Sequence, residues 1–402
     1  MTLPLKHILK NIKFNIQERV TATMSFPFNQ FALEAKEQNK SQEFIDACLA
    51  YASNLSEQGY PVTFSIEHLA MQIGVQSDYL RNLIGDGKRD ITYDYEHKYK
   101  RYNYFKLKKR DGNFREIMSP AKDLKFIQKW ILVNILSKYR LAESCKGFRK
   151  RISIYDNAKV HENSEIILKV DLLKFYDTIT EKRVYGLFKS LGYATNLSFS
   201  LAKITTAKHR KNYWRDFNNS SKEILSELVQ TKPAILPQGS PTSPMISNIL
   251  ATKMDYRFEG MAKKQNFRYS RYADDLTFSI TKEGSLPSLN VISKIITQEG
   301  FFINHKKTQY LKKGCKQYVT GLTTTNGINV NKKYRKQISE HIYFCRKYGV
   351  KSHLARRKKD FPNSNSLSFH NWLYGHLCFI NSVNSKASKT LLEEFNKINW
   401  SV

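Results

Sequence analysis

The sequence predicts a mixed α/β (α+β) fold, in which short strands and amphipathic helices alternate along 402 residues. Residues 275–280 alternate apolar and polar side chains, which is the period of a strand, and 268–272 before them have the composition of another. Residues 165–171, "EIILKVD", form an apolar run that ends in a carboxylate. Residues 246–261 repeat apolar side chains at helical spacing. A chain of this length is expected to contain two or three domains.

The charge balance predicts an acidic partner. The chain has 66 Lys and Arg residues against 35 Asp and Glu residues, a formal net charge of +31. No apolar run approaches the roughly 18 residues needed to cross a bilayer, so we expect no membrane partner. Five scattered cysteines without a CxxC pair are typical of a reducing compartment, and we expect a cytoplasmic protein.

Two aspartates stand side by side in "RYADDLTF", residues 271–278. The flanking strands place Asp274 and Asp275 at the tip of a short hairpin. Burying two adjacent carboxylates is costly unless a cation neutralises them, so the pair predicts a divalent-cation site. An exposed turn, in which both side chains are solvated, is the alternative that these residues alone leave open.

A third carboxylate, Asp171, ends the apolar run at the position where an open sheet places catalytic groups. A helix-capping aspartate is the alternative there. Gln238 and Gly239 lie in a proline-rich turn before the predicted helix, and such a loop can press its backbone against a flat ligand. A basic chain that carries cation-binding carboxylates favours phosphodiester chemistry over sugar or peptide chemistry.

In this order, Asp171, Leu236-Pro237-Gln238-Gly239 and Tyr272-Ala273-Asp274-Asp275 resemble the motifs of a reverse transcriptase, an RNA-directed DNA polymerase. Residues 104–120 are similar to the fingers hairpin of that family, and residues 300–308 to its lysine-bearing segment. The resemblance implies a right-hand polymerase with fingers, a ferredoxin-like palm and a helical thumb.

The resemblance also divides the chain. It implies an N-terminal helical extension at 1–95, fingers and palm at 96–320, and a thumb that binds the RNA or duplex at 321–402. Within the second part, the palm is expected from about 165 to 320, and the fingers from 96–164 and 195–235. Residues 1–60 receive no role.

The family's catalytic groups map onto this sequence residue by residue. Two Mg²⁺ ions are expected as cofactors, with carboxylates and one carbonyl as ligands: Asp171, Leu172, Asp274 and Asp275. The resemblance implies that Lys307 is the general acid that protonates the leaving pyrophosphate, with Lys306 as the neighbouring alternative. These groups would catalyse RNA-templated DNA synthesis by two-metal nucleotidyl transfer.

A further set of residues is expected to contact the deoxynucleotide and the template: Tyr176, Gln238, Gly239, Lys106, Lys108 and Arg115. The ring of Tyr176 would collide with a 2′-hydroxyl and so select deoxynucleotides, whereas an aromatic side chain buried in the core is the alternative. Which of the three basic residues neutralises the triphosphate is left open.

Short sequence signatures indicate which group of reverse transcriptases the chain resembles. "NAKVH", residues 157–161, and "VTG", residues 319–321, resemble the two signatures of retron reverse transcriptases, and residues 68–84 resemble their helical lead-in. The resemblance implies partners, namely a structured noncoding RNA, its branched RNA–DNA product (msDNA), and a separate effector or toxin protein in anti-phage defence. The alternatives are another defence-associated reverse transcriptase with a noncoding template, and a non-catalytic scaffold that holds RNA near an effector.

RNA contacts are expected from the two signatures and from a basic run in the thumb: Asn157, His161, Val319, Thr320, Gly321, Arg356, Arg357, Lys358 and Lys359. The basic run can equally be a solvated patch, as charge runs usually are.

Overall fold

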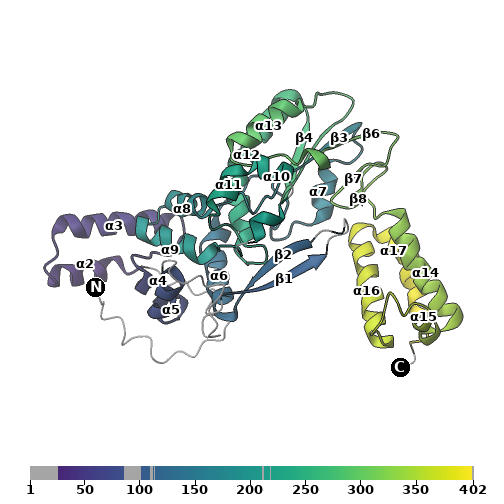
Figure 1. The fold of residues 1–402 in the computed structure, drawn as a ribbon, viewed down its shortest axis with the longest axis horizontal. Helices are drawn as coiled ribbons and strands as arrows, with labels where there is room; N and C mark the ends of the chain where they lie inside the picture. The colour runs from purple at the N-terminus through teal and green to yellow at the C-terminus, as the bar shows by residue number, and fades with distance from the viewer. Residues whose placement is uncertain are drawn as a thin grey trace. The chain divides into compact units, whose positions relative to one another are not determined.

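The computed structural model describes residues 26–85, 101–108, 112, 114–210, 212–217 and 219–400. Helices and strands alternate along these residues, which confirms the predicted α+β class (Figure 1). The chain forms two compact units, each built from separate stretches of sequence. They are Met1–Ala142, Leu173–Met254 and Ile295–Phe302 in the first, and Glu143–Leu172, Asp255–Lys294 and Ile303–Val402 in the second. The domain boundaries predicted near 95 and 320 stay a prediction. Two stretches of the predicted domains, residues 1–25 and 86–100, lie outside the described residues.

The first unit is mostly helical. Its helices are α2 (Phe28–Glu37), α3 (Gln42–Glu57), α4 (Ile66–Ile73), α5 (Ser77–Ile84), α6 (Lys122–Asn134), η3 (Leu136–Lys138), α8 (Glu181–Ser190), α9 (Thr195–Thr205), η4 (Tyr213–Asp216), α10 (Asn219–Ile224) and α11 (Ser226–Thr231). The hairpin predicted at 104–120 is confirmed, as β1 (Tyr102–Lys108) pairs antiparallel with β2 (Phe114–Pro120). The helical lead-in predicted at 68–84 corresponds to α4 and α5.

The second unit contains the palm sheet. Four antiparallel strands lie in the order β4 (Arg268–Tyr272), β5 (Asp275–Ile280), β3 (Ile166–Asp171) and β6 (Gln309–Lys312). Helices including α12 (Ser243–Gln265) lie between β3 and β4 in sequence, and α13 (Leu289–Gln298) lies between β5 and β6. This βαββαβ order, with the first strand central, is the ferredoxin-like arrangement that the sequence predicts.

Both faces of β5 are buried, whereas the alternation in 275–280 predicted a single buried face. On one face, the ring of Phe258 in α12 packs on Phe278, with centroids 5.1 Å apart. On the other face, Ser279 is fully buried against His161, at the end of α7 (Ile154–Val160). The prediction was wrong because the polar residues of β5 have hydrogen-bond partners and can be covered at little cost.

The second unit continues through η5 (His305–Lys307), β7 (Tyr318–Val319) and β8 (Leu322–Thr323) into four helices: α14 (Lys332–Tyr348), α15 (Val350–Arg356), α16 (Ser366–Val383) and α17 (Ser385–Asn396). These helices confirm the helical character predicted for the C-terminal part (Figure 1). Ile338, Ile342 and Cys345 form the buried apolar stripe of α14, whereas Phe344 beside them is 40% exposed. Among the described residues, no helix has the length and apolar character needed to span a membrane.

Candidate active site

The palm strands bring the three predicted aspartates to one edge of the second unit. Asp171 ends β3 and pairs with Asp275, the first residue of β5. The backbone N–H of Leu172 donates to the carbonyl of Asp274 at 2.9 Å, so the hairpin tip is fixed to the end of β3. The hairpin predicted at 268–280 is thereby confirmed, as is the convergence of carboxylates separated by about a hundred residues in sequence.

The turn between β4 and β5 is tight and strained. Ala273 has a φ of +56°, a conformation that costs a residue with a Cβ roughly 1–2 kcal/mol. The backbone at Gly147 packs directly against this turn, and a Cβ at that position would lie 2.6 Å from the nitrogen of Ala273. Only glycine therefore fits at position 147 without displacing the hairpin that carries Asp274.

A buried ion pair supports the same turn. Arg271 Nε and Nη2 donate to the two carboxylate oxygens of Asp255 at 2.9 and 2.7 Å, and both side chains are fully buried. Arg271 Nη1 donates to the carbonyl of Ala273 at 3.1 Å, and the hydroxyl of Tyr269 donates to Asp255 at 2.8 Å. Sequence reasoning missed this pair. The available signals were an aspartate inside the apolar repeat of α12 and an arginine in a strand with a buried core.

Electrostatic repulsion accumulates at the hairpin tip. Burial, reinforced by Asp171 and Asp275, raises the pKa of Asp274 from 3.8 to about 6. Burial is also the main cause that raises the pKa of Asp275, while Lys169 and Lys307 act in the opposite direction. Perturbation of this kind is typical of functional sites, because an ordinary fold gains nothing by holding carboxylates against one another.

Lys307 and Asn304 hold the third carboxylate. Lys307 Nζ lies 2.9 Å from Asp171 Oδ1, and Asn304 Nδ2 donates to Asp171 Oδ2 at 3.0 Å. Burial lowers the pKa of Lys307, but the hydrogen bond to Asp171 and the neighbouring carboxylates outweigh it, so the net shift is upward and the ammonium stays charged. The structure thus brings Lys307, rather than Lys306, to Asp171. Asn304 was missed, although a polar residue directly after "GFFI" was a usable signal.

We call these five residues the carboxylate cluster: Asp171, Asp274, Asp275, Asn304 and Lys307. As it stands, no group of three or more His, Cys, Asp or Glu side chains in the described part of the chain is arranged to hold a metal ion. Both oxygens of Asp171 are instead bound by Lys307 and Asn304. The donors are nevertheless carboxylates whose repulsion a cation would relieve, and oxygen ligands suit a hard divalent ion. The residues therefore fit a divalent metal.

The predicted nucleotide-contact loop lies in the first unit. The N–H of Met118 in β2 donates to the carbonyl of Gln238 at 2.7 Å. Gly239 has a φ of +119°, and a Cβ there would lie 2.9 Å from Ile117 Cγ2. The close backbone approach that the sequence suggested is thus made to the fingers hairpin, and contact of this loop with a base pair stays a prediction.

Basic residues of the fingers hairpin divide between its two faces. Lys106 and Lys108 are two apart in β1 and share a face. Arg115 pairs across the hairpin with Leu107, whose side chain points to the opposite face. The three residues therefore do not share one face of the hairpin, and which of them neutralises the triphosphate stays open.

Tyr176 lies in the turn between β3 and α8, in the first unit. Its ring centroid is 5.6 Å from that of Phe175, which is buried, while Tyr176 itself is partly exposed. The role of this ring in sugar selection stays a prediction.

The two short signatures meet in a buried polar network in the second unit. His161 lies 2.7 Å from Ser279 Oγ through Nδ1 and 2.8 Å from Ser270 Oγ through Nε2. Ser270 donates to Asn157 Oδ1 at 2.8 Å, and Asn157 Nδ2 reaches Thr320 Oγ1 at 3.5 Å. Burial, with Arg268, lowers the pKa of His161 to about 3, so the ring is neutral. We call this the histidine network: Asn157, His161, Ser270, Ser279 and Thr320.

Burial corrects part of the predicted RNA surface. Asn157, His161 and Val319 are buried, so their side chains offer no face to an RNA in this structure. They instead join α7 to the palm strands and to the "VTG" turn, where Thr320 and Gly321 both have positive φ. In the basic run, Arg356, Arg357, Lys358 and Lys359 are all exposed, and Arg357 pairs with Asp360 at 3.1 Å. RNA contact by Thr320, Gly321 and the basic run stays a prediction.

The ferredoxin-like palm with carboxylates at one edge defines a nucleotidyl-transferring polymerase, and comparison identifies its family. The chain belongs to the reverse transcriptase (RNA-dependent DNA polymerase) family, whose model matches residues 107–323. More particularly, it is a retron-type reverse transcriptase and therefore an RNA-directed DNA polymerase. Enzymes of this family use divalent metal ions and an RNA template.

Two retron reverse transcriptases support this assignment. The chain is 30% identical to the retron Ec86 reverse transcriptase of Escherichia coli over 365 residues, 89% of this chain and 95% of that protein. It is 35% identical to the retron Mx162 reverse transcriptase of Myxococcus xanthus, over 55% of this chain and 46% of that protein. A solved telomerase from Candida albicans, in complex with a fragment of telomeric RNA, aligns with 16% identity and a TM-score of 0.36, covering 74% of this chain and 63% of that one.

Proposed function

We propose that this enzyme copies a cognate structured noncoding RNA into a branched RNA–DNA molecule as part of an anti-phage defence system. The observation that carries the chemistry is the carboxylate cluster, in which three carboxylates are held at one edge by a fixed hairpin in spite of their repulsion. The relation to retron enzymes over nearly the whole chain supports the cognate RNA and the branched product. Five free cysteine thiols support a cytoplasmic location.

Different residues of the site would bind the metal ions and donate the proton. Asp171, Asp274 and Asp275, with the carbonyl of Leu172, would hold two Mg²⁺ ions. When bound, the ions would stabilise charge on the attacking 3′ oxygen and on the leaving group. Lys307 would then supply a proton to the departing pyrophosphate, and its raised pKa keeps that proton available at neutral pH.

Other residues would bind and select the deoxynucleotide. Lys106 and Lys108 share one face of β1, so together they form the better candidate contact for the triphosphate, and Arg115 the weaker one. The partly exposed ring of Tyr176 would exclude a 2′-hydroxyl. Gln238 and Gly239 would support the template through the backbone that they present beside β2.

The test is primer extension on a primed RNA template with Mg²⁺. Asp274→Ala combined with Asp275→Ala is expected to abolish DNA synthesis while the protein stays folded and binds RNA, because the pair holds cations and its removal relieves repulsion. A matched control changes two exposed aspartates of the first unit, Asp46→Ala and Asp78→Ala, and is expected to retain synthesis. Synthesis that persists in the first double variant would overturn the assignment.

A non-catalytic scaffold is disfavoured by the same site. A protein that only held RNA would gain nothing from three mutually repelling carboxylates, and the strained turn at Ala273 would serve no purpose. Sequencing the nucleic acid that copurifies with the protein distinguishes the retron proposal from another noncoding template, since only the former yields a branched RNA–DNA species.

A further inference from the structure

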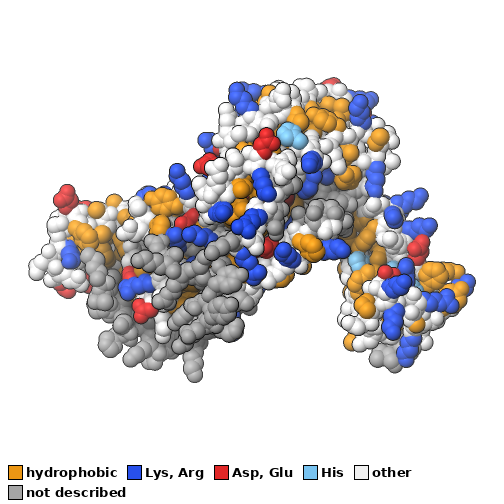
Figure 2. All heavy atoms as spheres, in the orientation of Figure 1, with side chains coloured by type: hydrophobic (Ala, Val, Ile, Leu, Met, Phe, Trp, Pro, Cys, Tyr) orange, Lys and Arg blue, Asp and Glu red, His pale blue; other side chains and the backbone are white. Residues whose placement is uncertain are grey.

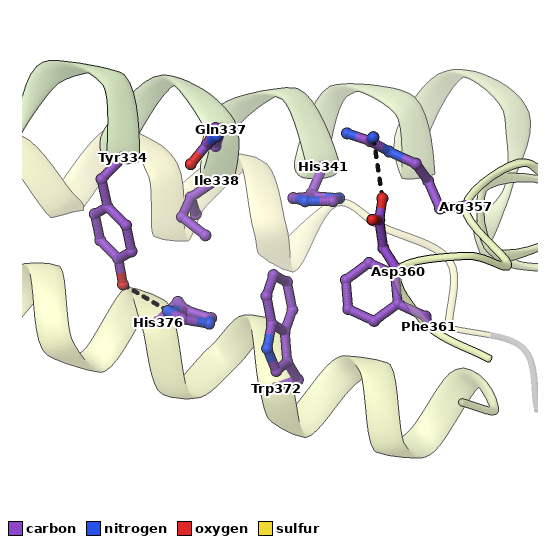
Figure 3. Close-up of a pocket in the computed structure, with 9 residues that line it drawn as sticks. All are labelled: Tyr334, Gln337, Ile338, His341, Arg357, Asp360, Phe361, Trp372 and His376. Atoms are coloured by element: carbon purple, nitrogen blue, oxygen red, sulfur yellow. Dashed lines mark hydrogen bonds and ion pairs between the residues drawn. The ribbon is translucent and has the colours of Figure 1, made fainter. Parts of the chain in front are cut away.

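A cavity of about 410 Å³ opens between α14, α16 and the loop that follows α15 (Figure 3). Its volume is within the range of small-ligand sites, roughly 300–1,000 Å³. Five of its lining residues carry rings and one carries a guanidinium: Tyr334, His341, Phe361, Trp372, His376 and Arg357. We call it the thumb pocket. Nothing in the polymerase chemistry proposed above uses it.

Trp372 is held rigidly in the thumb pocket. Its ring centroid lies 4.3 Å from that of His376, 4.9 Å from Phe361 and 5.3 Å from His341, each at a steep angle. A fourth ring, that of Phe369, packs nearly parallel to the indole at 5.5 Å. These rings fix the orientation of the indole, yet Trp372 is 37% exposed. A large ring that is fixed in orientation but open to solvent is a ready stacking platform, because little side-chain entropy remains to be lost on binding.

The remaining rings of the pocket are uncharged, and some of their polar atoms already have hydrogen-bond partners. The hydroxyl of Tyr334 lies 2.5 Å from His376 Nδ1, and His341 Nδ1 lies 2.8 Å from His353 Nε2. Burial, with His353 and nearby cations, lowers the pKa of His341 to about 4, and burial lowers that of His376. These rings therefore offer flat, uncharged surfaces with a few hydrogen-bonding edges. The one cation in the lining, Arg357, is paired with the carboxylate of Asp360, which also lines the pocket, so the lining is not a cage for an anion.

Positive charge flanks the pocket on both sides. Tyr334 belongs to the basic run 332–336, "KKYRK", and Arg357 belongs to the run 356–359, "RRKK". Figure 3 shows Tyr334 and Arg357 at opposite ends of the pocket. Figure 2 also shows Lys and Arg side chains on this face of α14 to α17, among apolar and other side chains. Two runs of basic residues that are separate in sequence thus each contribute one residue to the lining of this pocket, at its opposite ends.

We propose that the thumb pocket receives an unpaired nucleobase of RNA, which stacks on Trp372 while the adjoining phosphates lie against the two basic runs. Aromatic platforms within a basic groove are the general solution for binding single-stranded nucleic acid. The flanking charge matches a phosphate backbone, and the pocket takes a flat ring. A paired base inside a duplex cannot enter, so the pocket distinguishes unpaired from paired RNA. This inference rests on the RNA partner of the proposed function and adds a site for it.

The experiment measures RNA binding by the full chain, without DNA synthesis. The probe is a single-stranded RNA of about 12 nucleotides, and the same RNA annealed to its complement is the reference. Trp372→Ala is expected to weaken binding of the single strand roughly 5- to 100-fold and to leave the duplex unchanged, because the stacking energy disappears only where a base is free. The matched control is Tyr374→Ala, an exposed ring two residues along α16 that does not line the pocket, and it is expected to bind like wild type.

Salt separates stacking from charge. Stacking releases no counterions, so the factor by which Trp372→Ala weakens binding is expected to be the same at low and high salt. Replacing Arg356, Arg357, Lys358 and Lys359 by Ala should instead flatten the salt dependence, by roughly 0.7 in the slope of log K for each phosphate that the variant no longer neutralises. A Trp372→Ala effect that vanished at high salt would contradict stacking.

A second variant keeps the test independent of folding. Trp372→Phe retains a ring and is expected to recover most of the affinity that Trp372→Ala lacks. The RNA-induced quenching of indole fluorescence that we expect for wild type should be weaker in this variant. Equal single-strand binding by wild type and Trp372→Ala, or equal weakening for single strand and duplex, would overturn the pocket as a base site. Absence of DNA synthesis by wild type would overturn the proposed function and leave these binding results standing.

Discussion

Two polar clusters lie on the same strands of the palm, and their electrostatics are opposite. The histidine network is closed: both nitrogens of His161 have serine partners, and the ring is neutral. The carboxylate cluster is open: one lysine faces three carboxylates, and the pKa of Asp274 is raised to about 6. β4 and β5 contribute to both, through Ser270 and Ser279 in one case and through the hairpin tip in the other.

The contrast separates a structural role from a catalytic one. A network whose donors and acceptors are all matched holds elements together and gains nothing from a ligand. A cluster with surplus negative charge is stable only because the rest of the fold imposes it, and it gains from any cation that enters. The residues around His161 therefore join the palm strands to α7, while those around Asp274 are the ones that our proposal gives the chemistry.

The largest effect is expected from the support beneath the carboxylate cluster. Arg271→Met leaves Asp255 as a buried, unpaired charge, and the free energy of unfolding should fall by about 3–5 kcal/mol. Arg268→Met, on the same strand but exposed, is the control and should cost less than about 1 kcal/mol. Denaturant titration measures both. Adding Asp255→Leu to Arg271→Met should recover much of the stability; equal destabilisation by Arg271→Met and Arg268→Met would show that the pair is not needed.

The next largest effect concerns repulsion in the carboxylate cluster. The pKa of Asp274 is raised from 3.8 to about 6, so the folded chain binds this proton more tightly than the unfolded chain does. The free energy of unfolding therefore falls as pH rises from about 4 to 6, by about 3 kcal/mol at 1.4 kcal/mol per unit. In metal-free buffer at pH 8, Asp274→Asn should be more stable than wild type by up to that amount, and the gain should disappear at pH 4. A variant no more stable than wild type at pH 8 would contradict the repulsion.

The histidine network should show the opposite pH dependence, with a smaller effect. The pKa of His161 is lowered to about 3, whereas in the unfolded chain it is about 6.5. Protonation therefore favours unfolding, and stability that is present above pH 6.5 should fall by about 2 kcal/mol at pH 5. His161→Gln should lack this component, which is measured as the difference between variant and wild type at each pH. Identical slopes for the two proteins would show that the ring is accessible to protons.

Local patterns predicted much of the site. The alternation around Asp274 and the apolar run before Asp171 located both strands, whereas Lys307 was located by the resemblance of residues 300–308 to the family's lysine-bearing segment. Partners were not visible in the same way. Asp255 and Arg271 are in contact because α12 packs on the sheet, and the local sequence around either residue does not predict the other as its partner. His161 looked like an RNA contact because a polar signature gives no direction, and only the fold turns it inward. The register of one hairpin likewise separates Lys106 from Arg115.

The most direct test of the central claim, that the carboxylate cluster is a cation site, is the effect of Mg²⁺ on unfolding at pH 8 without nucleic acid. Wild type should gain stability with Mg²⁺, by about 2.7 kcal/mol at a hundred times the dissociation constant. His161→Gln should gain as much, because the histidine network holds no cation. Asp274→Asn with Asp275→Asn should gain nothing. A wild type that Mg²⁺ does not stabilise, or equal gains in wild type and the double variant, would contradict the account.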